Sequence, residues 1–389
     1  MKFSLTCISL FLVSVTASSN LSFTLERNSH YKPNAKRAVN RANAKYSTQP
    51  FTTDHGNSTN TMTALKTGSV PVVDHLYDIQ YYGTVKVGNP PQKFKVNFDT
   101  GSSDFWLAST MCSSCKSHTR FNANKSSTYK EDGRRWEIQY GDGSHANGIL
   151  GRDTINLGGI LIKNQTFGLA KLQSKSFAAD PVDGLLGLGF NKITTVKGVQ
   201  TPMDNMISKK LIKSPIFGVH LGKAIKNGGG EFLFGGFNTT KFKGALATVP
   251  VDNSAGFWGV KVDSLKVGTK KVYGSFKGIL DTGTTLLVFP DAIARKLAKA
   301  YKATDNMDGT FTISCDDSKL KPLMFSMNGK TFKVPSDSLI FERNETYCVA
   351  GFGYSHLDFS IIGDTFLKNN YVVYNHNVPN VRIAASIDQ

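Results

Sequence analysis

The feature that most constrains this chain is a tripeptide, Asp-Thr-Gly, that occurs twice and ends an apolar run each time. The first copy is Asp99-Thr100-Gly101, within VNFDTGSSDFW, and the second is Asp281-Thr282-Gly283, within GILDTGTTLLVF. The two copies lie 182 residues apart, close to half of the 389-residue chain. This spacing predicts two similar halves that each bring one carboxylate to a shared site. Two carboxylates held together do not both ionise readily, so the pair can supply a general base and a general acid.

A second repeated pattern supports an internal duplication. The segment GLLGLG at 184–189 places Gly187 88 residues after Asp99, and the segment SIIGD at 360–364 places Gly363 82 residues after Asp281. In both segments two apolar residues precede a glycine. The nearly equal offsets indicate that the two halves share one fold.

From about Gly68 onward, short alternating apolar runs and glycine turns predict strands. The run VPVVDHLYDIQYYGTVKVG, which ends in a Gly-Asn-Pro-Pro turn, is an example. Helical spacing occurs only at 32–46, 201–212 and 290–301. We therefore expect an all-β fold, mainly strands with a few short helices, and a mass of 42.4 kDa allows two domain-sized cores.

Residues 1–17 have the pattern of a secretory signal peptide. Lys2 precedes an apolar stretch, which ends in the small-residue site Val15-Thr16-Ala17 and is too short to span a membrane. No other segment of the sequence is long and apolar enough to span one. These features predict a secreted, extracellular protein without a membrane partner.

Secretion changes how the cysteines are interpreted. Cys7 would leave with the signal peptide, so four cysteines would remain, at positions 112, 115, 315 and 348. The spacing Cys112-Ser-Ser-Cys115 is also compatible with a zinc knuckle or a redox pair. A single such pair in an oxidising compartment favours two structural disulfides. Local pairing within each half gives Cys112–Cys115 and Cys315–Cys348.

The formal net charge is +17. Residues 1–67 contain eight Lys or Arg and two Asp or Glu, so about +11 remains on the rest of the chain. There is no dense basic run interleaved with aromatic residues, so we expect a spread positive surface and no nucleic-acid partner. Such a surface can weakly steer acidic partners. The eight histidines form no metal-binding motif such as HExxH, and we expect neither metal nor cofactor.

From about Val70 to the C-terminus, these motifs resemble those of the pepsin-like aspartic proteases, most of all the secreted fungal members, in the stretch YYGTVKVGNPPQKFKVNFDTGSSDFWL. The leader matches more loosely. The resemblance implies a bilobal fold with a cleft between pseudo-symmetric lobes, and an acid endopeptidase made as a zymogen. It divides the chain into an activation propeptide at 18–67, an N-terminal lobe at 68–252 and a C-terminal lobe at 253–389. It further implies protein and peptide substrates, pepstatin-type inhibitors and a monomer.

The resemblance also implies site roles. Asp99 and Asp281 would hold one water, which one carboxylate activates while the other protonates the scissile carbonyl. Ser102 and Thr284 would hydrogen-bond the outer carboxylate oxygens, Thr100 and Thr282 would tie the two loops together, and Gly101 and Gly283 would allow close approach. A single Asp-Thr-Gly is more often an ordinary turn; two in this context are not.

The segment Tyr140-Gly141-Asp142 follows WEIQ and matches the flap, a hairpin tip that closes over the substrate. Trp106 matches the indole that hydrogen-bonds the flap tyrosine. The resemblance implies that Asp142 allows Lys before the cleaved bond, in addition to large apolar residues. Phe177 and Leu185 fit an apolar pocket before that bond, and Phe257 and Ile279 fit one after it. These four are also compatible with plain core positions.

The leader matches a zymogen propeptide that places Lys45-Tyr46 against the catalytic carboxylates at neutral pH. Acid would protonate carboxylates, loosen these pairs and permit self-cleavage near Lys66-Thr67-Gly68. A generic basic leader used for folding is the alternative. Sequons in the mature part start at four candidate glycosylation sites, Asn124, Asn164, Asn238 and Asn344.

The main alternative from another class is a binding protein on the same fold that has lost catalysis. Both triplets, the flap tyrosine and the leader lysine are intact, which favours the enzyme. No serine or cysteine nucleophile motif is present. The basic net charge departs from the family's common acidic character and leaves the pH optimum and preferred substrates open.

Overall fold

The computed structural model describes residues 34–46, 66–75, 78, 80–139, 144–226, 228–344 and 346–389. The predicted signal peptide and the predicted flap tip at 140–143 lie outside these ranges. No helix of the described residues is long and apolar enough to cross a membrane.

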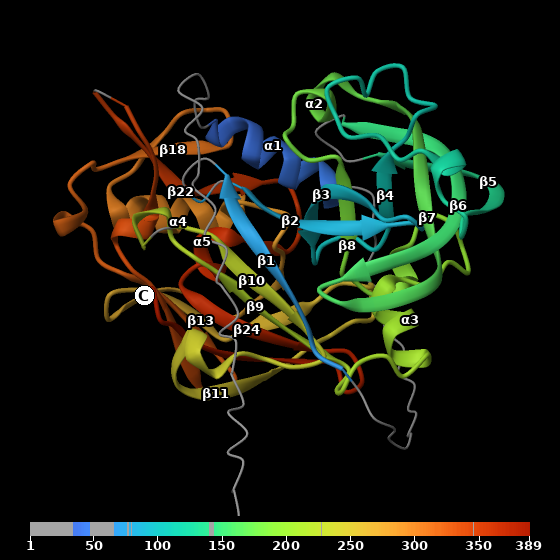
Figure 1. Cartoon of the computed structure of the whole chain (residues 1–389). Helices are drawn as coiled ribbons and strands as arrows, with labels where there is room; N and C mark the ends of the chain where they lie inside the picture. The colour runs from blue at the N-terminus through green and yellow to red at the C-terminus, as the bar shows by residue number, and fades with distance from the viewer. Residues whose placement is uncertain are drawn as a thin grey trace, which may run out of the picture. The chain divides into compact units, whose positions relative to one another are not determined.

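Within the described residues the chain is mainly strand, arranged in three sheets (Figure 1). The largest sheet has thirteen strands in the order β11-β25-β24-β9-β10-β1-β2-β3-β8-β4-β7-β6-β5. Its strands are β1 (Gly68–His75), β2 (Gln80–Val87), β3 (Gln92–Asp99), β4 (Phe105–Ala108), β5 (Lys130–Gln139), β6 (His145–Leu157), β7 (Ile160–Gln173), β8 (Gly184–Gly187), β9 (Ile216–Leu221), β10 (Gly230–Phe234), β11 (Phe242–Pro250), β24 (Asn370–Asn375) and β25 (Asn380–Ser386). The sheet draws strands from both halves of the sequence.

Two smaller sheets belong to the second half. The order β12-β15-β23-β16-β22-β18-β17, with β21 paired to β22, forms one, and β14-β13-β19-β20 forms the other. Their strands are β12 (Gly259–Val262), β13 (Ser264–Val267), β14 (Lys270–Tyr273), β15 (Phe276–Leu280), β16 (Leu287–Pro290), β17 (Thr304–Asp305), β18 (Thr310–Ile313), β19 (Leu323–Met327), β20 (Lys330–Val334), β21 (Ile340–Arg343), β22 (Cys348–Ser355) and β23 (Ser360–Ile362).

Helices in the described residues are short. They are α1 (Ala35–Tyr46), α2 (Lys175–Ala178), α3 (Pro202–Ser208), α4 (Asp291–Tyr301) and α5 (Asp364–Leu367), with 3₁₀ turns η1 (Ala123–Lys125), η2 (Asn191–Ile193), η3 (Ala224–Lys226), η4 (Thr239–Lys241), η5 (Asp317–Lys319) and η6 (Asp337–Leu339). The three predicted helices are therefore present. The helix expected at 201–212 begins at its capping box, Thr201 with Asp204, and ends earlier than expected, before Lys209.

The two halves repeat one strand arrangement. In the first half, β3 pairs in parallel with β8, β8 antiparallel with β4, and β4 in parallel with β7. In the second half, β15 pairs in parallel with β23, β23 antiparallel with β16, and β16 in parallel with β22. The repeated GLLG and SII segments are the central strands β8 and β23. Nearly all of their residues are buried, as expected for strands covered on both faces. This duplicated, mainly β architecture confirms the predicted fold class.

Helix α1 docks through one apolar stripe. Ala35, Val39, Ala42 and Tyr46 recur at helical spacing and are each at most 3% exposed. They belong to a cluster that includes residues of the second half, such as Val349. Two glycines make room for this contact, because a Cβ at position 309 or 353 would lie 2.8 or 2.6 Å from a methyl group of Val39.

Candidate functional site

The two Asp-Thr-Gly segments form the ends of equivalent strands. Asp99 is the last residue of β3, and Asp281 directly follows β15. Both side chains are almost fully buried, with exposed fractions of 1% and 0%. The backbone N–H of Gly101 donates to Asp99 Oδ1 and that of Gly283 donates to Asp281 Oδ1, each at 2.9 Å. The local geometry of the two carboxylates is therefore matched.

Two threonines join the loops. Thr100 Oγ1 donates to the carbonyl of Leu280 at 2.8 Å, and Thr282 Oγ1 donates to the carbonyl of Phe98 at 2.6 Å. Each hydroxyl also accepts the backbone N–H of the other threonine, at 3.1 and 3.0 Å. These bonds run between segments about 180 residues apart and hold the two carboxylates at one place.

Two hydroxyls contact the remaining carboxylate oxygens. Ser102 Oγ donates to Asp99 Oδ2 and Thr284 Oγ1 donates to Asp281 Oδ2, each at 2.5 Å. Hydrogen bonds donated to a carboxylate favour its ionised form. The site therefore compensates part of the cost of burying two acids. All six supporting residues predicted from the sequence lie beside the carboxylates.

Lys45, in the last turn of α1, reaches both acids. Its Nζ lies 2.6 Å from Asp99 Oδ1 and 3.0 Å from Asp281 Oδ2. The neighbouring Tyr46 donates its hydroxyl to Asp281 Oδ2 at 2.7 Å. The structure thus places the predicted pair Lys45-Tyr46 directly on the two carboxylates, where it covers them.

Close approach of this lysine requires the two glycines. A Cβ at Gly101 would collide with the Tyr46 hydroxyl and would lie 2.6 Å from Lys45 Nζ. A Cβ at Gly283 would collide with Asp99 Oδ1 and would lie 2.8 Å from the same ammonium. No larger residue fits at either position in this arrangement.

Burial and neighbouring charges give the two acids different pKa values. Burial raises the pKa of Asp99 to about 6, against the opposing attraction of Lys45. Burial alone would also raise the pKa of Asp281, but the charge of Lys45 and hydrogen bonds from its neighbours lower it to about 2. For Lys45, burial opposes the charged form, yet attraction to both carboxylates raises its pKa. The lysine therefore stays charged and the two acids differ in proton affinity.

A pocket opens beside Asp99. Trp106, Phe177 and Leu185 line it, as do Arg41 and Asp180. The ring centroids of Trp106 and Phe177 lie 5.1 Å apart. The predicted residues Phe177 and Leu185 are therefore at a pocket rather than only in the core.

Sequence reasoning missed the ion pair in this pocket. Arg41 Nη2 lies 3.2 Å from Asp180 Oδ2, and Gln80 Nε2 donates to Asp180 Oδ1 at 3.1 Å. Arg41 stands four residues before Lys45, so helical spacing places both on one face of α1. That signal could have identified Arg41. Asp180 carried no comparable signal.

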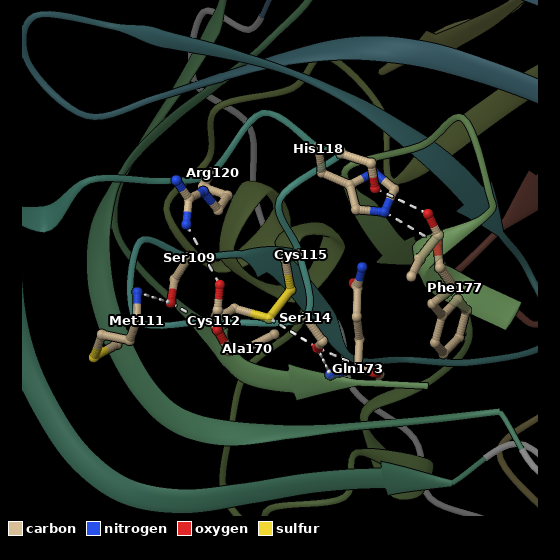
Figure 2. Close-up of a disulfide and its surroundings, with 12 residues drawn as sticks. Ser109, Met111, Cys112, Ser114, Cys115, His118, Arg120, Ala170, Gln173 and Phe177 are labelled. Atoms are coloured by element: carbon tan, nitrogen blue, oxygen red, sulfur yellow. Dashed lines mark hydrogen bonds between the residues drawn. A yellow bond between two sulfur atoms is a disulfide. The ribbon is translucent and has the colours of Figure 1, made fainter. Parts of the chain in front are cut away.

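The first disulfide lies near Phe177, one of the residues that line this pocket (Figure 2). Cys112 is bonded to Cys115, and Ser114 between them exchanges hydrogen bonds with the backbone of Gln173 at 3.0 and 3.1 Å. His118 Nε2 lies 3.0 Å from the carbonyl oxygen of Phe177, which accepts. The disulfide loop thus contacts the end of β7, and the segment that follows it contacts α2, which carries Phe177. Cys315 is bonded to Cys348, so both predicted pairs are formed.

Phe257 and Ile279 are not among the residues that line this pocket. They are 3% and 1% exposed and belong to the apolar cluster that includes α1. The ring of Phe257 meets that of Tyr46 edge-on, with centroids 5.3 Å apart. In this structure Tyr46 therefore packs against one of the two residues expected to form the second pocket.

The remaining predicted residues are placed as follows. Tyr140, Gly141 and Asp142 lie outside the described residues, so the expected contact of Trp106 with Tyr140 has no structural description. Asn124 and Asn164 are exposed, whereas Asn238 and Asn344 are half-buried, and their amides donate to Glu231 and Glu342. The described part of the chain contains no group of three or more side chains suited to hold a metal ion.

Comparison with known proteins adds to this geometry. Residues 80–386 match the family model for eukaryotic aspartyl proteases. The chain is 55% identical to rhizopuspepsin of Rhizopus chinensis, with 99% of both chains covered. It is 56% identical to syncephapepsin of Syncephalastrum racemosum over 94% of this chain and 92% of that one. It is 34% identical to pepsin A of Suncus murinus over 83% of this chain and 85% of that one.

Proposed function

Because this chain belongs to the eukaryotic aspartyl protease family and is a pepsin-like aspartic endopeptidase, we propose that Asp99 and Asp281 are its catalytic pair. The observation that carries this proposal is the convergence of two buried carboxylates on one cation, Lys45 Nζ. Once the lysine leaves, the two negative charges repel each other and one carboxyl keeps its proton. The ionised carboxylate then accepts a proton from the attacking water, while the protonated one donates to the scissile carbonyl oxygen.

The supporting hydrogen bonds give each acid a fixed orientation for these steps. Ser102 and Thr284 each hold Oδ2 of one acid, and the glycine N–H groups hold Oδ1. A proton-transfer site needs such preorganisation, because reorientation during the reaction would add to its barrier. We expect a bell-shaped pH profile on the acid side, since one acid must be ionised and the other protonated.

We further propose that residues 18–67 are an activation propeptide and that the protein is a zymogen. Lys45 and Tyr46 occupy the space where a substrate carbonyl and water would have to approach the carboxylates. The apolar face of α1 supplies the docking energy, with Val39 and Ala42 fully buried. We place the activating cleavage near Lys66-Thr67-Gly68, where 66 and 67 are exposed just before β1.

For the mature enzyme we propose a monomer with an N-terminal lobe at 68–252 and a C-terminal lobe at 253–389. A secretory signal at 1–17 would deliver it outside the cell. Asn124 and Asn164 are the most accessible glycosylation candidates, because their side chains are exposed and those of Asn238 and Asn344 are only half-exposed.

We propose a preference for large apolar residues before the cleaved bond, because Phe177 and Leu185 line the pocket beside Asp99. Asp142 would add tolerance of Lys at that position. Cleavage of matched Lys- and Phe-containing peptides by the wild type and by Asp142→Ala tests this. We expect the variant to lose the Lys peptide selectively; equal rates would contradict the role of Asp142.

The proposed catalytic pair is tested by digestion of haemoglobin or casein at acid pH. We expect activity in the acid-treated wild type and none in Asp99→Asn or Asp281→Asn, and we expect pepstatin to abolish it. Activity that persists in both variants would overturn the assignment. If the wild type is inactive, N-terminal sequencing separates an uncleaved leader from a binding protein that lacks catalysis.

A further inference from the structure

A lysine-lined groove lies in the second half of the molecule and plays no part in the proposed catalysis. Its volume is about 1090 Å³. Lys270 and Lys271 on β14 line it together with Lys296 and Lys299 on α4, which Figure 1 labels. All four side chains are exposed. Tertiary folding has therefore gathered cations from separate segments around one concavity.

Three more lysines complete the lining. Lys302 follows α4, and Lys319 and Lys321 come from the segment at and after η5. Seven lysines thus line the groove, and no Asp or Glu of the described residues does. Asp316 pairs with Lys319 at 3.2 Å but stands outside the lining. The groove is a local concentration of positive charge rather than part of a spread surface.

Such a concentration of like charge is mutually repulsive unless an anion compensates it. Lys296 and Lys299 lie three residues apart on α4, where like charges repel, and Lys302 follows directly after the helix. Protection of an edge strand explains lysines on β14, which is the edge of the four-stranded sheet. It does not explain those on α4 or at 319 and 321. The remaining lysines are better accounted for by an anionic ligand.

The other lining groups restrict the class of that ligand. Tyr301 is 7% exposed and donates its hydroxyl to the carbonyl of Lys321. Tyr273, on β14, is not among the lining residues, and Lys296 Nζ lies over its ring at 4.8 Å. Proteins bind single-stranded nucleic acids through open aromatic faces, which neither ring offers.

A peptide is also a poor fit. Val267, Ile313 and Leu320 line the groove but are at most 7% exposed. Of the other apolar lining residues, Val272 is half-buried and Ala300 is small, so the lining offers no large apolar pocket for a side chain. Hydroxyl groups do line it, at Thr304, Thr312 and Ser314. Ammonium and hydroxyl groups together suit a ligand that carries both anionic groups and many hydroxyls.

We propose that the groove among Lys270, Lys296, Lys299 and Lys321 binds an anionic polysaccharide, with its charged groups on the lysines and its sugar hydroxyls on the threonines. The proposal is independent of the proposed catalysis. The groove is larger than ordinary small-molecule sites, whose volumes are roughly 300–1,000 Å³, so it has room for several sugar units. Carboxylated and sulfated polysaccharides share this chemistry.

The test compares the acid-treated wild type with Lys270→Gln/Lys296→Gln/Lys299→Gln. The matched control is Lys86→Gln/Lys93→Gln/Lys130→Gln, which removes the same charge from exposed lysines on β2, β3 and β5. Binding to heparin and to polygalacturonate is measured by titration at neutral pH and at several salt concentrations. Single-stranded DNA and polyglutamate serve as probes of the two other classes.

We expect the groove variant to bind polysaccharide about tenfold more weakly, with a smaller salt dependence, while the control and the haemoglobin-digesting activity of both variants stay unchanged. Repetition at pH 3 separates the two sources, because carboxylates lose charge there and sulfates do not. Equal weakening in the groove variant and the control would overturn the proposal. Groove-dependent binding of DNA or polyglutamate without polysaccharide binding would overturn the polysaccharide class.

Discussion

Thr100 and Thr282 exchange hydrogen bonds across the middle of the molecule, each hydroxyl accepting the other's backbone N–H at 3.1 and 3.0 Å. Each hydroxyl also donates to a carbonyl of the opposite strand. The two threonines are 0% and 5% exposed, so no water replaces these bonds. The relative position of the two carboxylates thus depends on a short, fully hydrogen-bonded connection.

Replacement of Thr100 by Val should damage both stability and activity. The substitution keeps the shape but leaves the N–H of Thr282 and the carbonyl of Leu280 unsatisfied, which costs about 2–4 kcal/mol in free energy of unfolding. Urea denaturation followed by fluorescence measures this cost, and peptide hydrolysis measures the loss of kcat. Thr100→Ser retains the hydroxyl and serves as the control. A Val variant as stable and active as the Ser variant would contradict the structural role.

Replacement of Lys45 by Met should make the precursor activate at higher pH. In the wild type, the attraction between Lys45 and Asp99 is lost as pH falls through about 6, and that with Asp281 only near 2. Because the pKa of Lys45 is raised, the lysine remains charged throughout this window. Without it, the two buried carboxylates repel each other and the leader is released earlier. The rate of precursor cleavage across pH 3–7, followed by gel, should shift upward by about one pH unit, since one unit corresponds to about 1.4 kcal/mol.

Lys36→Met is the matched control, because Lys36 is exposed on the same helix. An activation profile identical in the two variants would remove Lys45 from the inhibitory role. Arg41→Gln should produce a smaller shift in the same direction as Lys45→Met, because Arg41 forms an ion pair with Asp180, which is not one of the catalytic carboxylates.

His376 should weaken the fold in acid. Its ring lies among Phe190, Trp258 and Phe217, with the first centroid 4.7 Å away, and burial lowers its pKa to about 4. Above pH 6.5 the histidine is neutral in both the folded and the unfolded chain, so it does not change the free energy of unfolding. Between 6.5 and 4 the unfolded chain binds a proton that the folded chain excludes, so stability falls as pH falls.

His376→Phe should keep the ring packing and remove this dependence. We expect the decline in the free energy of unfolding from pH 6.5 to 4 to become smaller by roughly 3 kcal/mol. Denaturation of an inactive Asp281→Asn background avoids self-digestion. His356→Phe, at an exposed position, is the control. Parallel pH dependences in the background protein and its His376→Phe form would exclude the effect.

The two disulfides should differ in their contribution to stability. Cys315–Cys348 closes a sequence separation of 33 residues and Cys112–Cys115 one of 3. Loop-closure entropy then predicts losses of about 4 and about 2 kcal/mol when each pair is replaced by serine. Thermal denaturation of the two double variants compares them. A larger loss for the short loop would show that its contacts with Gln173 and Phe177 outweigh chain entropy.

The sequence by itself determined the fold class, the duplication and the two carboxylates. Few other residues can replace the glycines and hydroxyl residues next to each acid, because the backbone around Asp99 and Asp281 leaves no room for other side chains. The leader lysine was identified from the resemblance to the family's propeptides, in which Lys45-Tyr46, after a short helical run, is the best match. Local backbone geometry and helical periodicity depend on residues that are neighbours in the sequence, so they can be predicted from it.

Only the tertiary structure decided which distant residues meet. The pairing of Arg41 with Asp180, the contact of Phe257 with Tyr46 and the lysine groove between β14 and α4 each join segments far apart in the chain. The residues next to a lysine or a phenylalanine in the sequence do not indicate which distant residue it contacts. Such contacts depend on how the sheets and helices pack, which is a property of the whole chain rather than of any one segment.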